Sequence, residues 1–264
     1  MKTPVACLVV LLVASLGIAQ QYNVPFKHAA AVGGGCTLGN EGDYHWTTDN
    51  GGITESSGAI SSWVDDVASY DIAISNGSQK PTLETAFLTG SDGALDGVTS
   101  DGGDCLKGGN FSGGALTQPF TVSMIVEYTD TGNRADHTGK LWFSGNDWTN
   151  NATHFNRYSS SKILSSINAG STLENGSYDW DVGNPHYVVI EFDGANSFIR
   201  VDGSEIQSGN TGTNVHDGFE LFMYPSCDGS SVEGTVVEII IEDAAYSGGD
   251  LTDLETYLAC RSGL

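Results

Sequence analysis

The stretch Phe120-Thr-Val-Ser-Met-Ile-Val-Glu-Tyr128 alternates apolar and polar side chains with a period of two. Its apolar members would share one face: Phe120, Val122, Met124, Val126 and Tyr128. Because successive side chains of a strand point to opposite faces, this pattern predicts a strand that packs one face on a hydrophobic core. Pro119 suits the residue before a strand, since proline cannot donate to a sheet ladder. A strand of this kind needs partner strands from the rest of the chain.

Similar patterns recur on the C-terminal side, separated by turn residues. Residues 186–193 and 197–202 predict a hairpin that turns at Gly194-Ala-Asn196. Further strands are predicted at 141–144, 219–224 and 235–242. Many short strands joined by turns are typical of a sandwich or jelly roll. We therefore predict an all-β fold, a sandwich or jelly roll with a short C-terminal helix.

That helix is predicted from the last residues of the chain. Thr252-Asp-Leu-Glu255 matches a capping box, in which the two outer side chains satisfy free N–H groups. Leu251, Leu254 and Leu258 form one apolar stripe, and Gly263 can end the helix. We expect it to lie against the sandwich as a terminal clasp.

The N-terminus predicts export. Lys2 is followed by an apolar run over residues 5–18, which is shorter than the ~20 residues that a spanning helix needs. Small residues at Gly17 and Ala19 predict cleavage after Ala19; a retained membrane anchor is the alternative. We expect a signal peptide at 1–19, an N-terminal arm at 20–43 and one domain at 44–264. The mature protein would be secreted, with no membrane insertion.

Charge narrows the range of partners. Ten Lys and Arg against 33 Asp and Glu give a formal net charge of -23 at pH 7. A surface of this sign repels nucleic acid and anionic lipid, so neither is expected as a partner.

Four of the five cysteines follow the leader: Cys36, Cys105, Cys227 and Cys260. An even number in an exported protein predicts disulfides, and three pairings are open. At 3.6 residues per turn, Cys260 points away from the leucine stripe and needs a partner that crosses the helix. The arm with Cys36 can do so. We therefore expect Cys36–Cys260 and Cys105–Cys227.

Four Asn-x-Ser/Thr sequons are candidate glycosylation sites: Asn76, Asn110, Asn151 and Asn175. All four lie in Gly/Ser/Asn-rich stretches, where a surface glycan would be tolerated. Chance occurrence in a chain rich in Asn and Ser is the alternative.

Several short motifs of the chain follow one another in the order found in a known domain family. They include Ile60-Ser-Ser-Trp63, Lys80-Pro-Thr-Leu83, Asp101-Gly-Gly-Asp104, Val188-Val-Ile-Glu-Phe-Asp-Gly194 and Val237-Glu-Ile-Ile-Ile241. In this order they resemble the laminin G-like domains of the concanavalin A-like lectin and glucanase superfamily, over residues 44–264. The resemblance implies two antiparallel sheets in a lectin-like jelly roll. It implies no single ligand, since that fold carries lectins, glucanases, lyases and structural modules.

The carboxylates of laminarinase-type glucanases are missing. Those enzymes hold two carboxyl groups about 5 to 5.5 Å apart, whereas Glu238 and Glu242 would be ~13 Å apart on a strand. Glu191 and Asp193 would be ~6.7 Å apart and suit an inverting pair, but Asp193 also suits the turn at Gly194. We expect a structural hydrogen bond for Glu238 and no enzymatic activity, with a glycoside hydrolase as the lesser alternative.

A sugar site needs an aromatic ring for stacking and polar groups that read hydroxyls. Loop 145–154 has this composition, and its candidate carbohydrate-binding residues are Asp147, Trp148, Asn150 and His154. A Trp148 that caps the core edge is the alternative, and a glycan on Asn151 would argue against a groove there. A second candidate comprises Tyr178, Trp180 and Asp181. Three further tryptophans are expected in the core: Trp46, Trp63 and Trp142.

Calcium is the cofactor that the resemblance suggests, because laminin G-like modules often hold it in a rim loop. Loop carboxylates that could supply ligands are Asp101, Asp104, Asp179, Asp181 and Asp228. A solvated acidic surface would produce the same pattern.

Two non-enzymatic functions follow. In the first, the chain is a secreted lectin-like module that binds extracellular glycans or mediates adhesion. In the second, it is a self-assembling subunit of an extracellular fibre or surface layer, whose arm over residues 20–40 pairs with the sheet edge of a neighbouring copy. An arm that is disordered or packs on its own chain is the alternative.

Overall fold

The structure is a computed structural model that describes residues 35–39, 42–49, 52–74, 78–129, 140–146, 151–159, 162–174, 178–222 and 232–264. Its strands are β1 (Tyr44–Thr47), β2 (Ile53–Ser56), β3 (Ala59–Val64), β4 (Asp71–Ala73), β5 (Thr82–Gly90), β6 (Gly93–Asp101), β7 (Leu106–Asn110), β8 (Phe120–Tyr128), β9 (Lys140–Ser144), β10 (Thr153–Ser159), β11 (Lys162–Asn168), β12 (Thr172–Glu174), β13 (Pro185–Phe192), β14 (Ser197–Val201), β15 (Ser204–Gly209), β16 (Gly218–Leu221) and β17 (Glu233–Glu242). A 3-10 turn, η2 (Gly194–Asn196), joins β13 to β14, and the helix α1 (Gly248–Ser262) follows β17.

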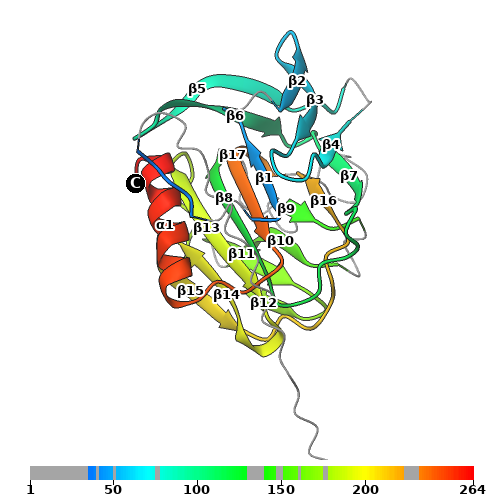
Figure 1. The fold of residues 1–264 in the computed structure, drawn as a ribbon, viewed down its shortest axis with the longest axis vertical. Helices are drawn as coiled ribbons and strands as arrows, with labels where there is room; N and C mark the ends of the chain where they lie inside the picture. The colour runs from blue at the N-terminus through cyan, green and yellow to red at the C-terminus, as the bar shows by residue number, and fades with distance from the viewer. Residues whose placement is uncertain are drawn as a thin grey trace, which may run out of the picture.

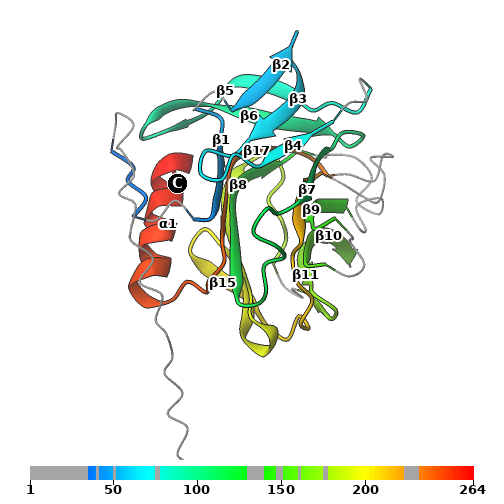
Figure 2. The same cartoon turned by 45° about the vertical axis from the view of Figure 1, so that its right-hand side comes forward.

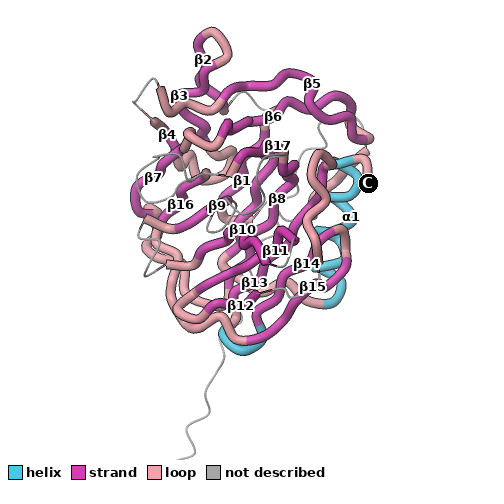
Figure 3. Tube along the Cα trace, turned by 180° about the vertical axis from the view of Figure 1, so that it is seen from behind, coloured by secondary structure: helices cyan, strands magenta, loops and turns pink. Residues whose placement is uncertain are grey.

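These strands form two layers, which we call the first and the second (Figures 1 and 2). The first runs β5-β6-β17-β8-β13-β14-β15, and β1 also pairs with β17. The second runs β2-β3-β4-β7-β16-β9-β10-β11-β12. The ladders between these strands are antiparallel, and the pair Ala59–Thr82 joins β3 to β5. The all-β sandwich expected from the sequence is confirmed, and strands dominate the view from behind (Figure 3).

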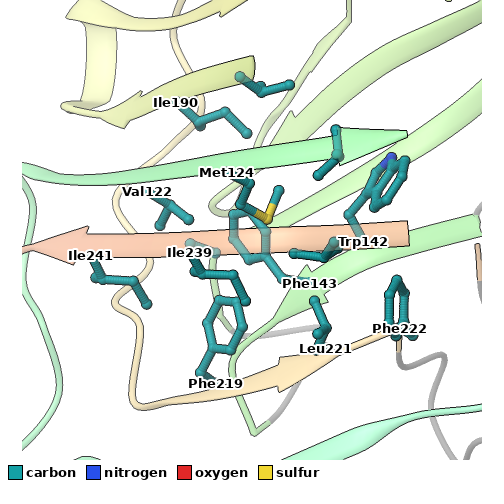
Figure 4. Packing of buried hydrophobic residues seen from close by; sticks show 14 of the residues in the cluster. Val122, Met124, Trp142, Phe143, Ile190, Phe219, Leu221, Phe222, Ile239 and Ile241 are labelled. Atoms are coloured by element: carbon teal, nitrogen blue, oxygen red, sulfur yellow. The ribbon is translucent and has the colours of Figure 1, made fainter. Parts of the chain in front are cut away.

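The main core fills the space between the layers. Figure 4 shows its centre, where Val122, Met124 and Ile239 of the first layer face Phe143 and Phe219 of the second. All five are at most 1% exposed. Trp46, Trp63 and Trp142 are fully buried in the same core, as the sequence predicts.

Strand β8 begins and ends at the predicted residues, but both of its faces are covered. Ile125, on the face opposite Met124, packs in a second core with Tyr187, Val189 and the α1 residue Leu258. Alternation in the sequence predicts one buried face; the second is buried because α1 lies across the outer side of the first layer (Figure 2).

The predicted capping box does not form. Helix α1 begins at Gly248, four residues before Thr252, and Ser247 is its N-cap. The Thr252 hydroxyl therefore lies inside the helix and donates to the Gly248 carbonyl. The other helix predictions are confirmed: Leu254 and Leu258 are buried, and Gly263 ends the helix in the left-handed conformation at φ 76°.

The N-terminal arm is tied to this helix. Cys36 and Cys260 form a disulfide, the pairing expected from the helix geometry. Leu38 is 6% exposed and packs in the second core, so the described part of the arm packs on its own chain. Cys105 is also disulfide-bonded, while its expected partner Cys227 lies outside the described residues. Within the part of the chain that the structure describes, no helix has the length and apolar character to cross a membrane.

Candidate functional site

A row of polar side chains crosses the outer face of the second layer. Lys107 of β7 pairs with Glu220 of β16, Glu220 with Ser144 of β9, and Ser144 with Thr153 of β10. The residue beside each in the chain is turned inward, as Leu106, Leu221 and Phe143 are in the core. Strand alternation therefore places this row on the side away from the core.

Glu220 is the most unusual member of the row, because a carboxylate with 1% exposure lies on an outward face. Its Oε1 lies 2.7 Å from Nζ of Lys107, whose side chain is 49% exposed. Burial raises the pKa of Glu220 above its ordinary value, and the lysine offsets only part of that rise. The pair thus presents a charged amine to solvent above a carboxylate whose charge is incompletely compensated.

Amides and a second carboxylate lie next to this pair. The Asn146 backbone N–H donates to Asp217 Oδ1 at 3.0 Å, and Asn146 Nδ2 donates to Asn110 Oδ1 at 2.6 Å. Asn146 can lie over β16 because residue 218 is glycine: a Cβ there would be 2.6 Å from Asn146 Nδ2. We call the group Lys107, Asn110, Asn146, Asp217 and Glu220 the Lys107 cluster.

Sequence reasoning missed most of this cluster and had Asn110 only as a sequon. A usable signal exists, however. Lys107 and Glu220 each follow a core residue of a short apolar strand, in Leu106-Lys107 and in Phe219-Glu220-Leu221. What the sequence does not reveal is that β7 and β16, more than a hundred residues apart, are neighbours.

Of the predicted sugar-binding loop, Asp147, Trp148 and Asn150 lie outside the described residues. His154 is described, and its predicted contact with a sugar is wrong. It is fully buried, with Nε2 2.7 Å from Ser165 Oγ and its ring stacked on Trp142. Burial lowers its pKa to about 3. The reason is position: His154 belongs to β10, whose alternation turns it inward.

Both ends of that loop meet the Lys107 cluster. Gly145 N donates to the Ala152 carbonyl at 3.3 Å, which closes the base of the loop. Asn146 on one side and Asn151 on the other both bond to Asp217, since Asn151 Oδ1 accepts the Asp217 N–H at 2.9 Å. The loop therefore leaves and rejoins the sheet beside the cluster.

The sequons differ in environment. Asn151 is 3% exposed and its Oδ1 is engaged, so its candidacy as a glycosylation site is corrected: a glycan needs an exposed amide. Asn110 is exposed and stays a candidate. Asn76 and Asn175 lie outside the described residues.

The second predicted sugar site is mostly core. Trp180 is 1% exposed, and its ring lies 5.9 Å from that of Trp142 and 5.7 Å from that of His186. With its ring inside the sandwich, Trp180 cannot stack on a sugar, although Tyr178 and Asp181 stay nearer the surface.

No group of three or more His, Cys, Asp or Glu side chains that could hold a metal ion occurs among the described residues. Asp101 and Asp104 occupy one turn, where the Asp101 N–H donates to Asp104 Oδ2 at 3.1 Å. Burial, with the nearby charge of Asp101, raises the pKa of Asp104 to about 6. Asp228 lies outside the described residues.

The carboxylates considered for catalysis have distinct surroundings. Asp193 accepts a bond from Asn196 at 3.0 Å within the η2 turn, as turn chemistry predicts. Glu191 is 5% exposed, Oε2 has no hydrogen-bond partner, and burial followed by the Asp193 charge raises its pKa to about 7. Glu238 makes the expected structural bonds, with His45, Tyr257 and Arg261.

Comparison with known proteins identifies structures that share the fold of this chain but does not assign the chain to a family. No family model matches the chain, and no curated protein matches it in sequence. Among solved structures, domain 4 of a GH43 extracellular arabinanase from Geobacillus stearothermophilus, in complex with arabinotriose, superimposes with a TM-score of 0.53 at 14% identity. That match covers 81% of this chain and 97% of the domain.

Two other matches are less close. A Trypanosoma rangeli sialidase with the inhibitor DANA has a TM-score of 0.47 at 14% identity, with 83% of this chain matched to 32% of that one. An arabinofuranosidase with arabinofuranosyl-alpha-1,2-xylobiose has a TM-score of 0.48 at 10% identity, over 77% of this chain and 51% of that one.

The arabinanase match corrects the expectation that the chain is not an enzyme. The domain on which it superimposes with a TM-score of 0.53 belongs to a GH43 arabinanase, so glycoside hydrolysis is no longer excluded. At 14% identity this likeness establishes a shared β-sandwich fold and assigns no reaction.

Proposed function

We propose that this chain is an extracellular, laminin G-like glycan-binding domain, and that the Lys107 cluster on the outer face of the second layer is its binding site. The observation that carries the proposal is the Lys107–Glu220 pair with the amides of Asn110 and Asn146 beside it. Sugar sites need a few placed polar groups that read hydroxyl groups, and these five residues supply that polar part of a site.

The hydrogen-bonding capacity of the cluster supports this role. Lys107 has three N–H donors, and its Nζ lies 2.7 Å from Glu220 Oε1, so donors remain for a ligand. An unmodified Asn110 can donate to a ligand through Nδ2, because its Oδ1 is engaged by Asn146, whereas a glycan on this sequon would occupy that donor. Asp217 keeps acceptor capacity, since a carboxylate has about four lone-pair sites. Donors and acceptors therefore alternate over a short stretch of surface.

Two further observations agree with the proposal. The arabinanase domain that shares the fold is in complex with arabinotriose, which makes a glycan the natural ligand class to test first. The Cys36–Cys260 disulfide suits an oxidising, extracellular setting, as does the signal peptide proposed at 1–19.

The test is a glycan array probed with the mature protein, followed by calorimetry with the best hit. We expect Lys107→Met to weaken binding at least tenfold with an unchanged circular dichroism spectrum. Glu205→Gln is the control, because Glu205 is exposed on β15 of the first layer. A Lys107→Met variant that binds like the parent would refute the site, and an array without any hit would refute the function.

Trp148 enters the proposal as the stacking residue, because the loop that carries it starts and ends beside the cluster. We expect Trp148→Ala to weaken glycan binding while the melting temperature changes little. A large drop in melting temperature would identify Trp148 as a core residue instead, and the loop would be dropped from the site.

A further inference from the structure

The charges of the Lys107 cluster bear on which class of glycan it takes. The cluster contains one cation and two carboxylates, and the cation is already 2.7 Å from one of them. Asp217 accepts the Asn146 backbone N–H, a neutral donor that adds no positive charge to the cluster. An incoming group therefore meets a surface on which negative charge exceeds positive charge.

Hydroxyl groups suit this surface better than anions do. A hydroxyl both donates and accepts, so one hydroxyl can donate to Asp217 while its neighbour accepts from Lys107 or Asn110. A carboxylate or sulfate on a sugar offers acceptors only. It would be attracted by Lys107 alone and repelled by both carboxylates.

The cation of the cluster, a lysine and not an arginine, also favours uncharged glycans over anionic ones. Arg is over-represented where proteins select carboxylates or phosphates, because its planar guanidinium binds them through two parallel hydrogen bonds. The cluster has a Lys, and that Lys is bound to a carboxylate beneath it. The formal net charge of -23 adds a repulsion of the same sign within the ~8 Å screening length of physiological salt.

We infer that the Lys107 cluster selects uncharged glycans with neighbouring free hydroxyls and rejects uronic, sialylated and sulfated ones. This inference rests on the proposed function. Asp217 discriminates because it can accept from a hydroxyl and repels an anion. Glu220, whose side chain is 2% exposed, discriminates only by repelling an anion from beneath Lys107.

The experiment uses the mature full chain on an array of matched pairs that differ by one carboxylate or sulfate, such as galactotriose with trigalacturonate and lactose with sialyllactose. We expect each bound neutral glycan to exceed its acidic partner at least tenfold. Its dissociation constant should change less than twofold between 50 and 500 mM NaCl. Acidic members that bind as tightly or more tightly would overturn the inference and leave the glycan-binding function intact. An array without any hit would overturn both.

Two variants test the discriminating residues. Glu220→Gln and Asp217→Asn should each weaken the binding of neutral glycans. Each should also lower, at least threefold, the ratio of the affinity for a neutral glycan to the affinity for its acidic partner. Glu205→Gln makes the same change of charge on the other layer and should keep the parent ratio. A Glu205→Gln variant that narrows the ratio equally would show that net charge, not the cluster, discriminates. Urea unfolding of each variant confirms that the fold is retained.

Discussion

Glu238 of β17 and Glu220 of β16 occupy the same kind of position in the two layers. Each lies on the outer face of its strand, is no more than 1% exposed and is paired with a cation. They differ in what covers them. Glu238 lies beneath α1, whereas the partner of Glu220 is a lysine that is half exposed.

Beneath α1, every part of the Glu238 carboxylate is bonded. Oε1 lies 2.7 Å from His45 Nε2 and accepts the Tyr257 hydroxyl, while Oε2 accepts Arg261 Nε at 2.9 Å. Burial raises the pKa of Glu238, but the bonds with His45 and the charge of Arg261 more than offset that rise, so the pKa is lowered. Arg261 continues the network to Asp49 at 2.6 Å and Asp92 at 3.5 Å.

This difference teaches how to tell a structural charge from one available to a ligand. A buried charge is tolerated when partners satisfy it fully, and then it locks one arrangement of the chain. The Glu238 network joins α1 to the sheet and has no capacity left over. Glu220 has a raised pKa and a half-exposed partner, so the charge that a ligand can reach here is that of Lys107.

The largest expected effect comes from breaking the Glu238 network. Arg261→Met leaves three carboxylates without their shared cation, and we expect a loss of about 3 to 5 kcal/mol in the free energy of unfolding. Arg200→Met is the matched control, since Arg200 also joins the sheet to α1, through Glu255, but is more exposed. Its loss should be about 1 kcal/mol or less. Equal losses in urea unfolding would contradict the comparison.

The next effect concerns pH: the contributions of Glu238 and Glu220 to the free energy of unfolding should change with pH in opposite directions. The lowered pKa of Glu238 gives stability that is present above the unfolded pKa and is lost as the pH falls. The raised pKa of Glu220 does the opposite: the carboxyl costs stability as the pH rises above its ordinary value of 4.5.

Hence Glu238→Gln should destabilise more at pH 7 than at pH 3.5, while Glu220→Gln should become more favourable as the pH rises. Unfolding free energies of both variants relative to the parent, measured in urea from pH 3.5 to 8, test this. Parallel pH slopes would show that the two carboxyls share one environment.

The smallest effect concerns the identity of the cations. Lys107→Arg should change the free energy of unfolding by no more than about 0.5 kcal/mol, because half of the lysine side chain is exposed. Arg261→Lys should cost more, since one ammonium cannot reproduce the contacts of the guanidinium with three carboxylates. Thermal unfolding of the two variants, each compared with the parent protein, measures both changes in stability. A larger loss for Lys107→Arg would mean that the cluster is as rigid as the buried network.

Much of the fold could be predicted from local patterns. Alternation located β8 to the residue and β13 and β14 to within one residue, because a strand with a buried face needs that pattern. The Cys36–Cys260 disulfide followed from helix periodicity, which turns Cys260 away from the leucine stripe. Helix α1 begins earlier than predicted, because a capping box is a preference of the first turn and Ser247 precedes it.

The sequence by itself determined the class of fold, the burial of Trp46, Trp63 and Trp142, and the helix that ends at Gly263, because these depend on periodicity and on the conformational freedom of glycine. Only the tertiary structure decided which polar residues meet. Lys107 and Glu220 are 113 positions apart and touch because β7 pairs with β16. His154 looks like a loop residue and is core, since pairing with β9 and β11 turns it inward. Strand pairing is non-local, and local patterns do not specify it.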